Sequence, residues 1–218
     1  MNVGILGGTG PAGSSLAARL ASVGYDVTIG SRAKERAEEV CAALQARWPD
    51  RNLKLAAGDN AEAAAAEVVV VATPWDSAAL TCLPLAEALA GKVVISMGNA
   101  LVKVGRELQP VGLARGSVAG SIQAVAPDAF VAAAFQHLPA RELGNLDDPV
   151  DCDVLICSDH PVATSTAAEL ASKIPGVRAL DAGRLANAGA VEAFVAVLIS
   201  LNIRYKTHAA VRLTGIEV

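Results

Sequence analysis

The first thirteen residues read MNVGILGGTGPAG, and this stretch decides the fold class. The aliphatic run Asn2–Leu6 predicts a strand, and Ser14–Val23 predicts a helix soon after it. Between them, Gly8, Gly10 and Gly13 form a G-x-G-x-x-G pattern. Such glycines permit a tight turn and let a pyrophosphate approach the helix N-terminus. The stretch predicts a dinucleotide-binding unit, and a glycine-rich turn without a ligand is the weaker alternative.

Short β-branched runs alternate with alanine-rich stretches beyond this turn, as they do in βαβ units. The run Val68–Thr73 is apolar on both faces, which predicts a central parallel strand. The other strands are predicted at Asp26–Gly30, Leu53–Ala57, Val93–Ser96 and Val131–Phe135, and the other helices at Ala33–Arg47, Ala61–Ala66 and Asp76–Ala90. The fold class is therefore α/β, with a doubly wound parallel Rossmann sheet.

The C-terminal third repeats this pattern on a smaller scale. Strands are predicted at Asp153–Cys157 and Val177–Leu180, with helices at Val162–Lys173 and Leu185–Ile203. This part is too short for a large core of its own and should pack against the first part or a partner chain. We predict a nucleotide-binding domain over residues 1–138 and a small C-terminal α/β domain over 139–218, ending in a long helix. The segment Lys103–Ala126 is predicted to be a loop that leads into a short helix.

The composition excludes several classes of protein. The chain has 218 residues, is 53% hydrophobic and carries a net charge of −4, which speaks against disorder and against nucleic-acid binding. The sequence shows no apolar run near the roughly 18 residues that would span a bilayer, and no basic region precedes its first strand. We expect a soluble, cytoplasmic protein that binds neither nucleic acid nor a membrane.

Neither the cysteines nor the histidines show the spacing of a metal site. The four cysteines have no CxxC pair, and His137, His160 and His208 are far apart. Small buried thiols in a reducing compartment are the simplest interpretation, and disulfide or metal use is the alternative. No metal site is predicted.

The end of the second predicted strand indicates which dinucleotide binds. An NAD site usually places an acidic residue there, but Asp26 stands at the opposite end of the strand. Instead, Ser31 and Arg32 follow the strand, with Lys34 and Arg36 close behind. A hydroxyl and cations match a 2′-phosphate, so NADP is favoured over NAD. Solvated charges on a first helical turn remain the alternative for Lys34 and Arg36.

Further strand ends should meet the cofactor at the same edge of the sheet. Thr73 and Trp75 follow the fourth strand, and Asn99 follows the fifth. Trp75 could face the ribose or nicotinamide, or could pack in the core. The turn after the sixth strand holds His137, for which a functional and a purely structural role are equally open.

The sequence contains no nucleophile set of Ser, His and Asp, no paired carboxylates and no P-loop. Hydride transfer between two redox cofactors needs none of these groups, because it requires only that the reacting carbons be held together in a dry cleft. The chain therefore fits such a reaction, and we assign no catalytic acid or base.

Several blocks resemble the NADPH-dependent coenzyme F420 reductases (F420H2:NADP oxidoreductases) over nearly the whole chain. The similar blocks are Leu6–Gly10, Gly30–Arg32, Pro74–Trp75, Leu138–Ala140, Asp153–Leu155, Leu180–Leu185 and Leu198–Lys206. The C-terminal block is the most diagnostic of these, because many NAD(P) enzymes share the glycine-rich turn.

The resemblance implies both the activity and the site. The enzyme would move a hydride reversibly between NADP(H) and the deazaflavin coenzyme F420, as a homodimer. The implied NADP-binding residues are Gly8, Thr9, Gly10, Pro11, Ala12, Ser31, Arg32, Arg36, Thr73, Trp75, Ala79, Asn99 and Ala140. The implied contacts to the deazaflavin are Gln136, His137, Leu138 and Ala209. The C-terminal domain would form one side of the deazaflavin cleft.

The basic tail is open to two interpretations. Arg204, Lys206, His208 and Arg212 could attract the phosphate and glutamates of coenzyme F420, or could complement the C-terminus of the long helix. The alternatives to the activity are an NADPH-dependent reductase of a flavin, ferric iron or an imine, and a non-catalytic NADP sensor.

Overall fold

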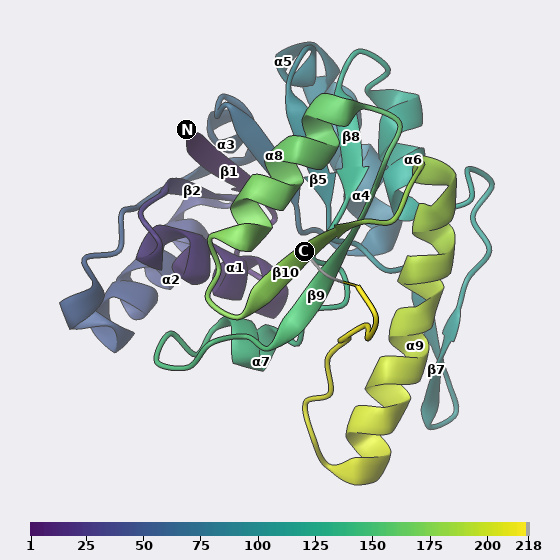
Figure 1. The fold of residues 1–218 in the computed structure, drawn as a ribbon. Coiled ribbons are helices and arrows are strands. Elements are labelled where there is room, and N and C mark those ends of the chain that lie inside the picture. Colours follow the sequence, from purple (N-terminus) through teal and green to yellow (C-terminus); the bar gives the residue numbers. More distant parts are fainter. Residues whose placement is uncertain (217–218) are drawn as a thin grey trace.

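The computed structural model describes residues 1–216, and their centre is an eight-stranded sheet (Figure 1). Its strands are β1 (Asn2–Leu6), β2 (Asp26–Ser31), β3 (Leu55–Asp59), β4 (Val68–Val71), β5 (Val93–Ser96), β8 (Phe130–Ala133), β9 (Cys152–Ser158) and β10 (Val177–Asp181). The order across the sheet is β10-β9-β8-β5-β4-β1-β2-β3. The six neighbouring strands β8, β5, β4, β1, β2 and β3 all run parallel. The predicted doubly wound α/β sheet is confirmed, with its change of direction between β1 and β4.

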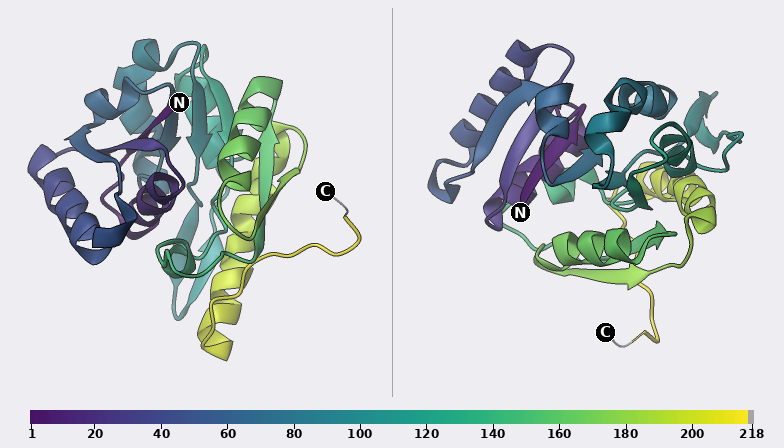
Figure 2. Two further views of the ribbon diagram at one scale, coloured as in Figure 1. Left: turned by 60° about the vertical axis from the view of Figure 1, so that its left-hand side comes forward. Right: turned by 90° about the horizontal axis from the view of Figure 1, so that it is seen from above.

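Helices cover both faces of this sheet (Figure 2). The helices of eight residues or more are α1 (Pro11–Ser22), α2 (Lys34–Arg47), α4 (Trp75–Cys82), α6 (Val118–Val125), α8 (Pro161–Ser172) and α9 (Ala188–Tyr205). The shorter ones are α3 (Asn60–Ala64), α5 (Ala86–Leu89), α7 (Ala140–Leu143), η1 (Pro49–Arg51), η2 (Leu83–Leu85) and η3 (Leu185–Asn187). The helix predicted over Asp76–Ala90 is thus three short pieces, because Pro84 interrupts it.

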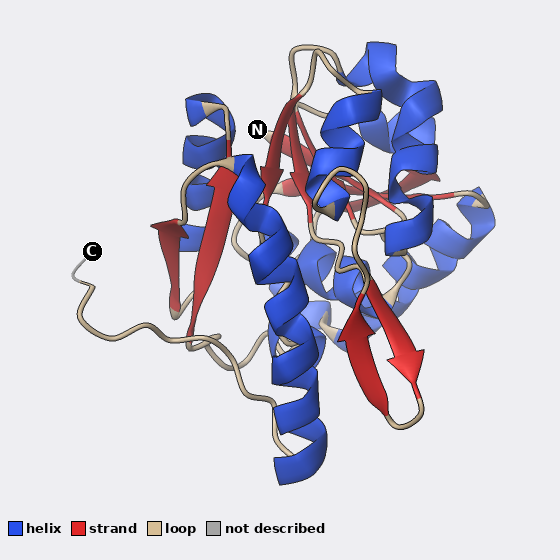
Figure 3. Ribbon diagram, turned by 90° about the vertical axis from the view of Figure 1, so that its right-hand side faces the viewer, coloured by secondary structure: helices blue, strands red, loops and turns tan. Residues whose placement is uncertain are grey.

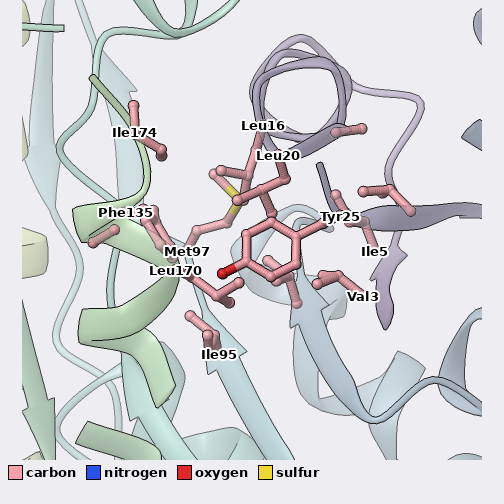
Figure 4. Packing of buried hydrophobic residues seen from close by; sticks show 14 of the residues in the cluster. Val3, Ile5, Leu16, Leu20, Tyr25, Ile95, Met97, Phe135, Leu170 and Ile174 are labelled. Atoms are coloured by element: carbon pink, nitrogen blue, oxygen red, sulfur yellow. The ribbon is translucent and has the colours of Figure 1, made fainter. Parts of the chain in front are cut away.

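The strand β4 shows why its sequence has no polar alternation. Val68 and Val70 belong to the core that α1, α2 and α8 cover, whereas Val69 and Val71 belong to the core under α3, α4 and α6. All four valines are buried, as expected for a central strand with helices on both sides. Figure 4 shows Leu16 of α1 and Met97 among the side chains of the first core.

The segment predicted as a loop contains a β-hairpin, so that prediction is wrong in part. The strands β6 (Leu101–Val104) and β7 (Glu107–Pro110) pair antiparallel, and Gly105 adopts a φ of 61° at their two-residue turn. Glycine at this position favours a tight hairpin turn. The hairpin stands beside α9 (Figure 3), where Arg204 contacts Glu107 at 2.9 Å.

The C-terminal extension continues the same sheet. The strand β9 pairs antiparallel with β8 through Ala132–Ser158 and Ala133–Cys157, and β10 runs parallel to β9. The boundary at residue 138 stays a prediction, and residues 217 and 218 of the predicted second domain lie outside the described residues. The small α/β extension that ends in a long helix is present, as predicted.

A buried arginine links the two parts. Arg19 of α1 is 2% exposed and donates hydrogen bonds to the backbone carbonyls of Leu143 (2.9 Å), Glu142 (3.0 Å), Asn145 and Asp148 (3.2 Å). Burial lowers the pKa of this guanidinium from its ordinary value. These bonds satisfy the carbonyls at the end of α7 and hold the segment after it against α1.

The long helix α9 is attached to α6 by one buried carboxylate. Glu192 is 3% exposed and accepts hydrogen bonds from the backbone N–H groups of Val118 (2.8 Å) and Ala119 (3.3 Å). Burial raises the pKa of Glu192 to about 7, against the opposing effect of these two bonds. A carboxylate at the start of a helix also complements its dipole.

The same helix bears on the expectation that no apolar run nears the length of a bilayer span. Within residues 1–216, the stretch Leu185–Tyr205 is long and apolar enough to cross a membrane by length and composition alone. A single helix of this kind is weak evidence, since core helices of soluble proteins pass the same test.

Candidate functional site

A cleft of about 960 Å³ opens where the carboxyl ends of β1, β2, β4 and β5 meet. This is the change of direction in strand order, where ligands bind in doubly wound sheets. The predicted residues that line it are Thr9, Gly10, Pro11, Ala12, Ser31, Arg32, Arg36, Thr73, Trp75 and Asn99. The fold thus brings together residues from four separate strand ends.

The glycine-rich turn forms one wall of the cleft. Gly7 has a φ of +66°, and a Cβ there would lie 2.5 Å from Thr73 Cγ2, so a side chain would be strained and would clash. Helix α1 then begins at Pro11 with Gly10 as its N-cap, and Gly10 has no side chain that could cap the helix. The first N–H groups of α1 are therefore suited to an anion in the cleft.

Three of the predicted NADP residues, Gly8, Ala79 and Ala140, do not line the cleft. Ala140 lines the neighbouring second cavity instead. Gly8 lies behind the turn, where its N–H donates to Gly30 O at 2.9 Å and a Cβ would lie 3.1 Å from Ile29 Cγ2. Ala79 is half-buried on α4, one turn beyond Trp75. Gly8 thus shapes the turn through packing against β2.

The cations after β2 differ in their partners. Lys34 pairs with Glu62 (2.7 Å) and does not line the cleft, whereas Arg36 lines it but also pairs with Glu39 (2.7 Å). Arg32 lines the cleft, is exposed and has no ion pair among the described residues. A cation without a carboxylate beside a dinucleotide cleft suits a phosphate ligand.

Trp75 packs beside the core and also lines the cleft, where facing the ribose or nicotinamide stays a prediction. Its indole N–H donates to Leu101 O at 3.0 Å, and its ring packs beside the core under α4 while still lining the cleft. Asn60, which the sequence did not single out, also lines the cleft and accepts a hydrogen bond from Gly7 N at 3.1 Å. Its place just after β3 is the signal that could have identified it.

A second cavity of about 260 Å³ adjoins the cleft. Ala12, Met97 and Asn99 line both spaces, so the two adjoin at these residues. The wall of the second cavity also contains the four residues predicted to contact the deazaflavin, Gln136, His137, Leu138 and Ala209, together with Ala140, which the sequence analysis predicted for NADP. Most of the residues predicted for NADP thus line the cleft, and those predicted for the deazaflavin line the adjoining second cavity.

Polar atoms without partners gather around this junction. Both side-chain polar atoms of Gln136, Nδ1 of His137, Oδ1 of Asn99 and Oγ1 of Thr73 are buried without a hydrogen-bond partner in residues 1–216. Buried polar groups are normally satisfied, so such a group of orphan atoms suits a polar ligand. Gln136 is 4% exposed, and its amide can both donate and accept.

His137 is held in place from one side only. Its Nε2 lies 2.8 Å from the backbone O of Asp153, while its Nδ1 is one of the orphan atoms. Burial lowers the pKa of His137 from its ordinary value, which favours the neutral ring. A neutral ring that donates through Nε2 leaves Nδ1 as an acceptor.

The turn that carries these residues is strained. Phe135 is 1% exposed and has a φ of 65°, a conformation that few bulky residues adopt. Asn99 Nδ2 donates to Gln136 O at 2.8 Å and fixes the turn to the end of β5. Strain of this kind is retained where the surroundings hold it, often at functional sites.

Helix α9 belongs to the C-terminal part that the resemblance placed at the deazaflavin cleft, but the sequence analysis named none of its lining residues. Val195, Leu198, Ile199 and Asn202 line the second cavity, and Met97 lines both spaces. The apolar periodicity of the helix predicted a packed face, but no local pattern could show what that face covers.

The basic tail is largely occupied by contacts within the chain. Arg204 pairs with Glu107, and Arg212 pairs with Asp151 and Asp153. His208 Nε2 lies 3.1 Å from Arg141 Nη1. Because both arginines are paired with carboxylates, Lys206 and His208 are the tail residues better placed to attract an anion.

The described residues contain no cluster of three or more His, Cys, Asp or Glu side chains that could hold a metal ion. All four cysteines are free and buried, and burial raises the pKa of Cys82 to about 12 and that of Cys41 to about 11. Such thiols are poor nucleophiles.

The sheet order, the glycine-rich turn and the cleft at the strand ends define a Rossmann-type dinucleotide-binding protein. Residues 2–100 match the family model "NADP oxidoreductase coenzyme F420-dependent". The chain is 38% identical to the F420-dependent NADP reductase of Methanocaldococcus jannaschii, over 100% of both chains. It is 39% identical to the enzyme of that name from Methanothermobacter marburgensis, over 99% of both chains.

A solved structure from Arthrobacter sp. FB24, provisionally assigned as an F420-dependent NADP reductase, superposes with a TM-score of 0.84 at 25% identity. The match covers 99% of this chain and 100% of that one. The chain belongs to the family of F420-dependent NADP reductases. The resemblance noted in the sequence is confirmed.

Proposed function

We propose that this protein transfers a hydride reversibly between NADP(H) and the deazaflavin coenzyme F420. The observation that carries the proposal is the pair of adjoining spaces, a cleft of about 960 Å³ and a cavity of about 260 Å³ that share Ala12, Met97 and Asn99. A hydride acceptor and donor must lie about 3–3.5 Å apart, which two adjoining sites allow. The names of the full-length relatives support the same pair of substrates.

NADP(H) fits the larger cleft. The N–H groups at the start of α1, with Thr9 to Ala12, would hold the pyrophosphate, and Ser31, Arg32 and Arg36 would hold the 2′-phosphate. Trp75 would lie beside the ribose and nicotinamide, and the orphan hydroxyl of Thr73 could satisfy a polar group there. The lack of a carboxylate after β2 favours NADP over NAD.

The deazaflavin fits the second cavity. The amide of Gln136 can donate and accept, as a ring edge with alternating carbonyl and N–H groups requires, and Nδ1 of His137 can accept. Leu138, Ala140 and Ala209 supply apolar walls. When bound, the two cofactors supply the redox chemistry, and the chain orients them and excludes water, so no side chain needs to move a proton.

The test mixes the purified protein with NADPH and oxidised coenzyme F420 and follows the deazaflavin absorbance. We expect bleaching at a rate proportional to enzyme concentration, and much slower bleaching with NADH. Free flavin in place of coenzyme F420 should give little oxidation of NADPH. Failure to bleach coenzyme F420 together with rapid flavin reduction would show that the protein is a reductase of another acceptor. Binding of NADPH without turnover of any acceptor would instead support the alternative that the protein is a non-catalytic NADP sensor.

The exposed face of α9 supports a homodimer. Phe194, Val197, Leu201 and Tyr205 are all exposed and follow one helical stripe at spacings of three and four residues. Exposed apolar stripes of this length commonly mark an interface. We expect a dimer by light scattering, and a monomer for Leu201→Glu; a monomeric parent protein would contradict the proposal.

The remaining expectations concern organisation and location. We propose that residues 1–138 bind NADP(H) and that 139–218 form one side of the deazaflavin cavity, a division supported by the residues of α9 that line this cavity.

The free buried cysteines support a reducing, cytoplasmic location. The net charge of −4 supports partners that are small molecules rather than nucleic acid or a membrane.

A further inference from the structure

A fully buried carboxylate lies between the edge strands and the end of the chain. The side chain of Asp153, on β9, is 0% exposed. It accepts hydrogen bonds from Arg178 Nε (2.7 Å) and Nη2 (2.8 Å), from Arg212 Nη1 (3.0 Å) and from the backbone N–H of Leu213 (2.6 Å). Such charge-assisted bonds are what make a buried carboxylate tolerable, and the bond from Arg178 holds its pKa below the ordinary value.

These bonds fasten the C-terminal segment, residues 207–216, to the body of the protein. After α9 the chain reverses and runs back towards β9 and β10 (Figure 1). Ala209 N donates to Asn202 Oδ1 (2.6 Å), and Asp153 N donates to Val211 O (2.7 Å). Arg178 also donates to Leu213 O (2.7 Å). Asp153 therefore holds the segment both through its backbone and through its side chain.

The backbone of the same residue also contacts another part of the second cavity's lining. The backbone O of Asp153 lies 2.8 Å from His137 Nε2. His137 and Ala209 both line the second cavity, although 72 positions separate them in the chain (209 minus 137). Two walls that are remote in sequence are thus attached to one residue, which itself does not line the cavity.

We propose that the carboxylate of Asp153 is a positioning group for the second substrate: it holds the C-terminal segment against β9, whose backbone contacts His137, at the spacing that the deazaflavin requires. The inference rests on the proposed function, because it assigns the second cavity to coenzyme F420. Neither Asp153 nor its two arginines line the NADP cleft. Loss of the Asp153 carboxylate should therefore weaken the binding of coenzyme F420 and leave the binding of NADPH unchanged.

The variants are chosen to separate positioning from general stability. Arg212→Ala removes one link between the C-terminal segment and Asp153 and leaves the Arg178 pair intact, and Arg212→Lys retains the charge. Asp153→Asn removes the charge at nearly constant volume. The matched control is Arg184→Ala, because Arg184 is an exposed arginine paired with Asp159 at 2.8 Å and lines neither space.

Steady-state kinetics with each substrate varied in turn gives the first readout. For Arg212→Ala and Asp153→Asn we expect the KM for coenzyme F420 to rise about tenfold, with the KM for NADPH changed less than about twofold. In Arg212→Lys and Arg184→Ala, both KM values should stay close to those of the parent protein. Equal increases in both KM values, or none in either variant, would overturn the proposal.

Amide hydrogen exchange gives a second readout that does not depend on the reaction. In Arg212→Ala, peptides that cover residues 205–216 should exchange faster than in the parent protein, and those of α2 should not. Unchanged exchange at 205–216 would overturn the anchoring. If the parent protein does not reduce coenzyme F420, the proposed function fails while this measurement still decides whether Arg212 and Asp153 hold the segment. If Asp153→Asn does not fold, Arg212→Ala carries both readouts.

Discussion

The double variant Ser31→Asp with Arg32→Ala is expected to lower the preference for NADPH over NADH about a hundredfold or more. Ser31 ends β2 and is 7% exposed, and Arg32 follows it at the cleft without an ion pair among the described residues. A charge-assisted hydrogen bond to a phosphate contributes about 1.5–3 kcal/mol, and about 1.4 kcal/mol corresponds to a factor of ten. The new carboxylate would also repel the 2′-phosphate and accept hydrogen bonds from the ribose of NADH.

The measurement is kcat/KM for each nucleotide with coenzyme F420 held saturating. Lys34→Ala is the matched control, because Lys34 lies two residues further on but pairs with Glu62 and does not line the cleft. We expect its nucleotide preference to stay within about twofold of the parent protein. If the double variant kept the full preference for NADPH, the 2′-phosphate would have to bind elsewhere.

Gly4→Ala is expected to destabilise the protein by at least about 3 kcal/mol. A Cβ at Gly4 would lie 1.8 Å from the backbone O of Ala63, at α3. The strand cannot move aside, because β1 is paired on both edges, with Gly4 opposite Thr28 on β2 and Val69 on β4. Helix α3 would have to shift and lose its packing on the sheet.

Urea unfolding monitored by circular dichroism gives the change in the free energy of unfolding. Gly112→Ala is the control: a Cβ there meets nothing within 4 Å and its φ is not positive, so we expect a change within about 0.5 kcal/mol. A Gly4→Ala variant within about 1 kcal/mol of the parent protein would show that β1 and α3 are less closely packed than the structure indicates.

Local patterns predicted most of the Rossmann sheet. The predicted strands Asn2–Leu6 and Val93–Ser96 coincide with β1 and β5, because β-branched runs between helical stretches are a local signal. The hairpin of β6 and β7 was missed, since its strands have four residues each and are mostly exposed, and thus lack a buried face that would give a pattern. Length and apolar pattern predicted α9, but not which of its residues line the second cavity.

Within the candidate site, the sequence placed residues that follow a strand directly, such as Thr9, Arg32 and Asn99, because all parallel strands end at the same edge. It missed Asn60, which directly follows β3, because the predicted strand ended two residues early at Ala57. It also missed the α9 residues, whose positions depend on how distant elements pack.

The sequence by itself determined the fold class, the dinucleotide turn and the preference for a 2′-phosphate, because each depends on residues within a few positions of one another. Only the tertiary structure decided that Lys34 is paired while Arg32 has no ion pair within residues 1–216, that Gly4 must lack a side chain, and that Asp153 contacts both His137 and the C-terminal segment. Each of these depends on a contact between residues that are distant in the chain. Such contacts arise from packing, which leaves no periodic signal in the sequence.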